Sequence, residues 1–141
     1  LIKFLPKDKF LGVMNCSDVM LDPFYRGCGT TAFDAFGLGL PIITLPGIHA
    51  RSRAVYGLYK IMGINKPPIA NSTSEYINLC TELINMTSET QAKLRDEIKF
   101  NYKKVLQSNE QSIAEMTLKI KELVSAQPIH QAINNRDHET S

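Results

Sequence analysis

The sequence predicts an α/β fold in which a parallel sheet is followed by C-terminal helices. Short apolar runs alternate with longer helical segments over residues 1–45. Three amphipathic stretches rich in Lys, Glu and Gln come after residue 72, so the last third is helical. The chain has 141 residues, 43% of them hydrophobic and 21% charged, which is enough to bury one core. We expect one domain over residues 1–124 and a disordered tail over 125–141, where apolar periodicity is lost.

Each expected strand is a short apolar run, and each expected helix carries apolar residues at helical spacing. The expected strands are 2–5, 19–21, 41–45 and 66–70. The expected helices are 7–16, 30–38, 50–62, 73–86, 89–106 and 113–124. The β-α-β-α-β order of the first half implies parallel strands joined by right-handed crossovers.

Further strands are expected upstream of this sequence in the natural protein. The chain begins at Leu1, without Met, inside an apolar run that is typical of a strand. Three or four strands are also fewer than the five or six that open doubly wound sheets usually have.

Composition argues against several classes of protein. The formal net charge is +2, and the basic residues are interspersed with acids, which does not favour nucleic-acid binding. No apolar run approaches the roughly 20 residues that cross a bilayer, and no targeting segment opens the chain. Cys16, Cys28 and Cys80 include no CxxC pair and have no His at metal-ligand spacing. We expect a cytoplasmic protein, also nuclear if eukaryotic, with no membrane anchor and no metal site.

A glycine-bearing loop after the second expected strand is the first candidate site. Ligands of open parallel sheets bind outside the carboxyl ends of the strands. Gly27 and Gly29 can adopt conformations closed to other residues and let the main chain approach a ligand. Thr30 and Thr31 add hydroxyl groups at the start of a helix, where unpaired amides and the helix dipole favour an anion. A diphosphate fits such a place.

The same residues also fit a purely structural role. Thr31 and Asp34 have the spacing of a capping box, in which the hydroxyl caps the helix and the acid reaches back to the cap amide. A carboxylate in the first helical turn stabilises the helix dipole whether or not it touches a ribose. Capping and ligand binding therefore both stay open at this point, and the two can coexist.

Five segments, taken in order, resemble the C-terminal catalytic lobe of the O-linked N-acetylglucosamine transferases and their bacterial tetratricopeptide-repeat relatives. These segments are 17–24, 27–35, 39–47, 51–53 and 58–64. The resemblance implies a GT-B architecture, in which two Rossmann-like lobes face a cleft and the C-terminal lobe holds most of a uridine diphosphate (UDP) sugar.

The resemblance also implies roles for individual residues. In the family a Thr-Thr pair at a helix start binds the diphosphate, which matches Thr30 and Thr31 after Gly29. A carboxylate three residues later contacts the ribose, which matches Asp34. A lysine just after a strand-ending proline clamps the phosphates, which matches Lys7. A cation there would stabilise the charge of the leaving group; the alternative is a solvated lysine in a first helical turn.

The sequence departs from the family pattern at two positions. The family's best-studied members carry histidine where this chain has Gly29 and Phe10. His49 and Arg51 follow another expected strand and, with Gly27, are further candidates for contact with sugar or phosphate; the alternative for both is a solvated residue at a helix start. We assign no catalytic residue, because the resemblance places the general base on the upstream lobe.

The resulting hypothesis is the donor-binding part of an inverting glycosyltransferase. It moves N-acetylglucosamine or a related hexose from a UDP-sugar to Ser or Thr hydroxyls of a protein, and it needs no cofactor or metal, since no DxD-like acidic cluster is present. Its partners are the UDP-sugar, the acceptor protein and the upstream lobe, without which this part is expected to be inactive. The alternatives are an inactive nucleotide-sugar-binding or regulatory module, and another GT-B enzyme such as a UDP-sugar epimerase.

Overall fold

The computed structural model describes residues 3–107 and 110–126. The chain divides into two compact units, Leu1–Gln107 and Ser108–Ser141. The first unit contains a small parallel sheet with helices around it, and the second contains one described helix, α6 (Glu110–Ser125). No helix in these described ranges is both long and apolar enough to cross a membrane.

The sheet is parallel, as predicted, but much smaller than expected. Strand β1 (Met20–Leu21) pairs with β2 (Ile42–Ile43), with Met20 opposite Ile42 and Leu21 opposite Ile43. The expected fourth strand is reduced to a single parallel bridge between Thr44 and Ile69. Backbone hydrogen bonds lengthen the pairing slightly, since the amide of Asp22 donates to the carbonyl of Ile43 at 2.9 Å. Most of the first unit is therefore helical.

The prediction of a strand at 2–5 is wrong for residues 3–5, which have no regular structure. Residue 2 lies outside the described residues. Phe4 is 98% exposed. An extended segment becomes a strand only when its amides and carbonyls pair with a neighbouring strand. No described strand lies beside residues 3–5 to provide that pairing.

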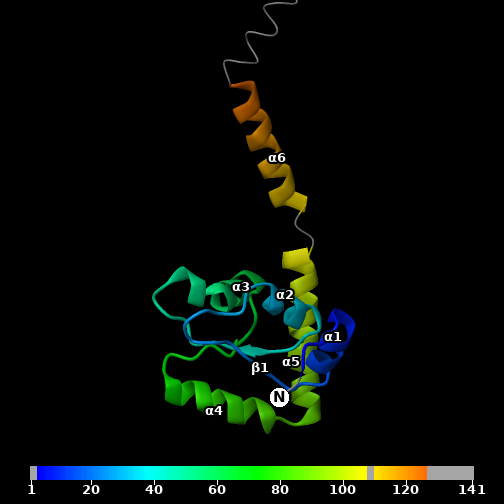
Figure 1. The fold of residues 1–141 in the computed structure, drawn as a ribbon, viewed down its shortest axis with the longest axis vertical. Helices are drawn as coiled ribbons and strands as arrows, with labels where there is room; N and C mark the ends of the chain where they lie inside the picture. Colours follow the sequence, from blue (N-terminus) through cyan, green and yellow to red (C-terminus); the bar gives the residue numbers. More distant parts are fainter. Residues whose placement is uncertain (1–2, 108–109, 127–141) are drawn as a thin grey trace, which may run out of the picture. The chain divides into compact units, whose positions relative to one another are not determined.

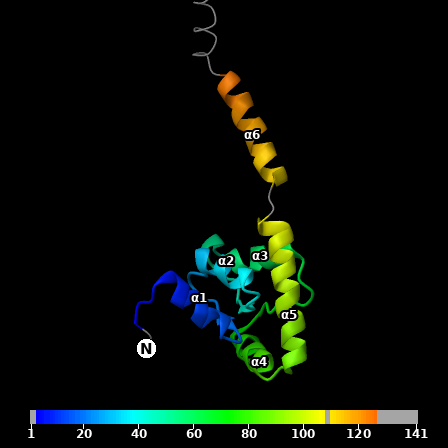
Figure 2. The same ribbon diagram turned by 90° about the vertical axis from the view of Figure 1, so that its right-hand side faces the viewer.

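Helices cover both faces of the sheet. Helix α1 is Lys7–Asn15, α2 is Thr30–Gly37, α3 is Ala54–Met62, α4 is Thr73–Ile84 and α5 is Ser88–Asn101. Figures 1 and 2 both show α2 and α3 on one side of the sheet and α4 on the other. Neighbouring residues of β2 face opposite sides. Ile42 accordingly packs with α2 and α3, and Ile43 packs with α4 residues.

The larger core lies between the sheet, α2, α3 and α5. It includes Phe36 and Tyr59, whose rings meet edge to face at 4.9 Å. The Tyr59 hydroxyl donates to the carbonyl of Ile42 at 3.0 Å and accepts from the amide of Ile42 at 2.8 Å. Gly39, with φ +73°, allows the chain after α2 to approach α5, because a Cβ there would lie 2.5 Å from the carbonyl oxygen of Arg95. These contacts hold α2 in place, and the first residues of α2 belong to the candidate site.

Two of the expected helices change geometry along their length in the structure. The helix expected at 50–62 is divided into a 3-10 turn, η1 (Ala50–Ser52), and α3, because Arg53 leaves helical geometry at φ −120° and ψ 5°. The helix expected at 89–106 begins at Ser88 and becomes the π-helix η2 (Tyr102–Gln107). Most of the expected tail lies outside the described residues; its first residue, Ser125, ends α6.

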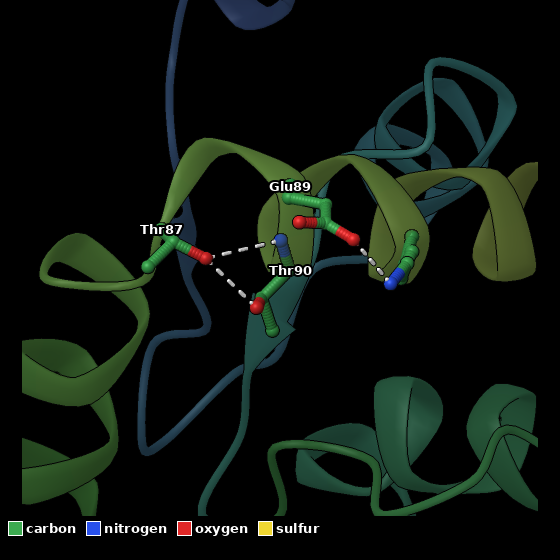
Figure 3. Close-up of polar contacts among 4 residues, drawn as sticks. Thr87, Glu89 and Thr90 are labelled. Carbon is green, nitrogen blue, oxygen red and sulfur yellow. Dashed lines mark hydrogen bonds and ion pairs between the residues drawn. The ribbon is translucent and has the colours of Figure 1, made fainter.

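The helix starts differ in how they are capped. Helix α5 has a hydroxyl cap, since Thr87 Oγ1 accepts from the amide of Thr90 at 3.3 Å (Figure 3). Glu89 in its first turn pairs with Lys93 at 2.6 Å. Helix α4 is capped in the same way by Ser72. Helix α2 has no such cap, and this difference is important for the site.

Candidate functional site

The candidate site lies at the carboxyl ends of the two parallel strands. The chain leaves β1 at Leu21, passes through a loop over residues 22–29, and enters α2 at Thr30. The chain leaving β2 passes through residues 44–49 into η1. The two connections are joined by a hydrogen bond from the amide of Gly27 to the carbonyl of Arg51, at 3.0 Å. This edge is where open parallel sheets bind ligands.

The start of α2 presents open amides to this edge. Gly29 is the N-cap residue, and no side chain caps the helix. The amide of Ala32 bonds to the carbonyl of Gly29 at 3.0 Å, whereas the amides of Thr30 and Thr31 precede the first intrahelical bond. Thr30 is exposed and Thr31 is half-buried. The two threonines predicted from sequence therefore lie beside unpaired amides at the positive end of the helix dipole.

The capping-box alternative is wrong. It required Thr31 to be the N-cap residue, but the helix begins two residues earlier, at the Gly29 cap, so Thr31 is the second helical residue. Asp34 consequently lies beyond the first turn, too far along to reach back to the cap amide. Within residues 3–107, neither threonine hydroxyl makes a hydrogen bond. Both hydroxyls are thus available to a ligand.

Lys7 and Asp34 come together beside this helix, although they are 27 positions apart in the sequence. Lys7 Nζ lies 3.8 Å from Asp34 Oδ1, and the side chains are 77% and 29% exposed. An ion pair this exposed contributes little to stability. Asp34 lies four residues after Thr30, which is about 6 Å along the helix axis. The Asp34 carboxylate, with the Lys7 ammonium group beside it, is thus carried by the same helix as the open amides.

Lys7 and Asp34 also line a hollow of about 620 Å³, whose other walls include Phe4, Phe10 and Val13. Gly29 lines a different hollow, of about 540 Å³, with Phe33 and residues of η1 and α3. Of the five predicted donor-binding residues, Lys7 and Asp34 thus line the first hollow and Gly29 lines the second. Thr30 and Thr31 are not among the residues that line these two hollows. The structure brings Lys7 and Asp34 together but does not place Lys7 and Gly29 in one hollow.

The two glycines of the loop differ in what surrounds them. Neither has a positive φ, so left-handed geometry does not explain them. A Cβ at Gly29 would meet nothing within 4 Å. A Cβ at Gly27 would lie 3.1 Å from a carboxylate oxygen of Asp22 and 3.4 Å from the carbonyl oxygen of Arg51. Gly27 is thus confined by the protein itself.

Asp22 is the residue that sequence reasoning missed, because its position suggested only the end of a strand. It is 2% exposed. Its Oδ1 accepts from the amide of Cys28 at 2.6 Å, and its Oδ2 accepts from Thr44 Oγ1 at 2.7 Å. Burial and the neighbouring Asp22 raise the pKa of the Cys28 thiol to about 12, so this thiol is neutral at physiological pH. An acid directly after an apolar strand and before a glycine loop was the available signal.

His49 and Arg51 contribute backbone atoms to this region. The carbonyl of His49 accepts from the amide and hydroxyl of Ser52, at 3.0 and 2.9 Å. The carbonyl of Arg51 accepts from Gly27. Both side chains are exposed at the edge where the loops meet. Across the described ranges, no group of three or more His, Cys, Asp or Glu residues is arranged to hold a metal ion.

No protein-family model matches this sequence, and no curated protein matches it. Among solved structures, the chain is similar to a mutant O-GlcNAc transferase of Thermobaculum terrenum, with a TM-score of 0.73 and 27% sequence identity. The similarity covers 86% of this chain but 23% of that one. Over most of its length, this chain is therefore similar in fold to part of an O-GlcNAc transferase, and it spans about a quarter of that transferase's length.

Proposed function

We propose that this chain forms the nucleotide-sugar-binding part of a GT-B glycosyltransferase that uses a UDP-sugar. One observation carries the proposal: α2 begins with uncapped amides and two unbonded threonine hydroxyls at the carboxyl edge of parallel strands. This arrangement suits a diphosphate, because backbone amides, hydroxyls and the helix dipole all favour negative charge there. The similarity to an O-GlcNAc transferase supports the same assignment.

The proposed contacts follow the order of groups along a nucleotide sugar. Thr30 and Thr31 bind the diphosphate with their amides and hydroxyls. Asp34 accepts hydrogen bonds from the ribose hydroxyls about 6 Å further along α2. Lys7 is 77% exposed, and Asp34 is its ion-pair partner among residues 3–107, so it can turn its ammonium group towards the phosphates. Gly27, Gly29, His49 and Arg51 form the rim around these contacts.

The proposed reaction transfers N-acetylglucosamine or a related hexose to a Ser or Thr hydroxyl of a protein. The acceptor oxygen attacks the anomeric carbon from the face opposite the diphosphate, and the bond from that carbon to the phosphate oxygen breaks. UDP leaves with the electron pair, and the acceptor proton passes to a base outside this chain. The amide end of α2 and Lys7 stabilise the charge on UDP as it leaves. No cofactor is needed.

The rest of the reaction belongs to the intact protein. This chain spans 23% of the transferase that it resembles. We assign the general base and the acceptor surface to another lobe of the same protein, which faces this one across a cleft. This part alone is therefore expected to bind the donor weakly and to transfer no sugar.

A second candidate is a module that binds nucleotide sugar without turnover. Phe10 lines the same hollow as Lys7 and Asp34, at a position where the transferases that the chain resembles carry histidine. A phenyl ring neither donates nor accepts a conventional hydrogen bond, so this change removes a polar contact from the donor side. The module would keep the α2 site and lack catalysis.

Two measurements on the intact protein test these proposals. The first is titration calorimetry with UDP, with inorganic phosphate as a comparison. The second is mass spectrometry of a Ser- and Thr-containing peptide after incubation with UDP-N-acetylglucosamine. Binding with transfer supports the enzyme, binding without transfer supports the module, and no binding of UDP refutes both.

A further inference from the structure

We infer that Asp22 is a positioning residue, which holds the loop over residues 22–29 in the shape that presents the amides of α2 to an anion. The inference rests on the proposed function, because it concerns the same diphosphate site. Asp22 itself is buried, and both of its carboxylate oxygens are bonded to other groups of the protein. It acts through the two groups that its carboxylate binds.

The carboxylate joins the ends of both strands. Oδ1 accepts from the amide of Cys28 at 2.6 Å, in the loop after β1. Oδ2 accepts from Thr44 Oγ1 at 2.7 Å, just after β2. Hydrogen bonds to a charged acceptor are shorter and stronger than those between neutral groups. Cys28 is two residues before Thr30, so fixing its amide also fixes where α2 begins.

The surrounding contacts leave this carboxylate little freedom. The backbone carbonyl of Asp22 accepts from the Tyr76 hydroxyl at 3.1 Å, which ties the strand end to α4. On the other side, Gly27 lies so close that a Cβ would be 3.1 and 3.3 Å from the two carboxylate oxygens. The loop is thus held from both sides, and glycine at position 27 is what allows the carboxylate to fit.

The arrangement also divides the amides between protein and ligand. The amide of Cys28 is already used by Asp22 and is not available to a phosphate. The amides of Thr30 and Thr31 remain for the ligand. The negative charge of Asp22 does not itself attract an anion, so its benefit to binding comes from geometry. A neutral side chain of the same shape should therefore support binding, and a truncated one should not.

Two matched pairs of variants separate geometry from charge. Asp22→Asn keeps an oxygen for the Cys28 amide and can donate to the Thr44 hydroxyl, whereas Asp22→Ala removes both contacts. Thr44→Ser keeps the buried hydroxyl, whereas Thr44→Val keeps the shape and removes the donor. The Thr44 pair guards against an Asp22→Ala protein that fails to fold.

The first readout is the dissociation constant for UDP in the intact protein. We expect about tenfold or weaker binding for Asp22→Ala, about three- to tenfold weaker binding for Thr44→Val, and values within about threefold of wild type for Asp22→Asn and Thr44→Ser. Leu83→Ala serves as a destabilised control, because it opens a cavity in the core where α4 packs and removes no hydrogen bond from the loop. This variant should bind UDP normally. Equal weakening by Asn and Ala at position 22, or by all destabilised variants, would overturn the inference.

The second readout needs no ligand. Hydrogen exchange over residues 24–31, followed by mass spectrometry, reports whether the Cys28 amide stays bonded. Faster exchange is expected in Asp22→Ala than in wild type or Asp22→Asn, and unchanged exchange in Asp22→Ala contradicts the inference. If the wild-type protein does not bind UDP, the proposed function fails, while this exchange still decides whether Asp22 holds the loop.

Discussion

Replacing Thr30 and Thr31 together by valine should weaken UDP binding with almost no effect on folding. The structure separates the two effects, because neither hydroxyl caps α2 or makes another hydrogen bond within residues 3–107. Valine keeps the branched shape and has a helix propensity close to that of threonine. We expect the free energy of unfolding to change by less than about 0.5 kcal/mol.

The expected loss of binding comes from two charge-assisted hydrogen bonds to the diphosphate. At about 1–2 kcal/mol each, they amount to about 2–4 kcal/mol, or about a thirtyfold to thousandfold increase in the dissociation constant. Titration calorimetry of the intact protein with UDP measures this increase. A dissociation constant that stays within about threefold of wild type would remove both threonines from the site.

Thr87→Val is the matched control for this double variant. Thr87 Oγ1 caps α5, so the same chemical change removes a hydrogen bond that the fold uses (Figure 3). Loss of such a cap costs about 1 kcal/mol in the free energy of unfolding. Thr87→Val should therefore lower stability and leave UDP binding unchanged. If it weakened UDP binding as much as the double variant does, the site assignment would be wrong.

Three further variants test the fold around the site. Tyr59→Phe leaves the buried amide and carbonyl of Ile42 without their partner. The free energy of unfolding, measured by urea denaturation, should therefore fall by about 1–3 kcal/mol. Gly39→Ala should lower the free energy of unfolding by about 3 kcal/mol or more in the same assay, because φ is +73° and the new Cβ would lie 2.5 Å from the carbonyl oxygen of Arg95. A smaller loss would show that α2 and α5 can separate easily. Burial raises the pKa of Tyr76 from 10.0 to about 12, so its protonated form contributes stability that is complete below pH 10 and is lost as the pH rises towards 12. Tyr76→Phe should therefore reduce the fall in unfolding free energy between about pH 10 and 12, and an unchanged fall would contradict that cause.

Local pattern was sufficient to predict most helices and the direction of the strands. Helices α1 and α2 begin at Lys7 and Thr30, where apolar periodicity placed them. The parallel pairing of β1 and β2 follows from a helix between two apolar runs. Sheet size was not predictable in this way, because a strand depends on a partner that the sequence around it does not contain. Residues 3–5 are apolar in part yet remain unpaired.

By itself, the sequence determined which residues are candidates: the glycine loop, Thr30 and Thr31, Asp34 and Lys7. Only the tertiary structure decided between capping and an open helix end, because that depends on which side chains bond to the first amides of α2, and the sequence pattern does not show those bonds. Tertiary structure also revealed Asp22, whose partners Cys28 and Thr44 lie on two different connections. Hydrogen bonds between segments far apart in the chain leave no periodic pattern in the sequence, so the residue that shapes the loop was visible only in the folded protein.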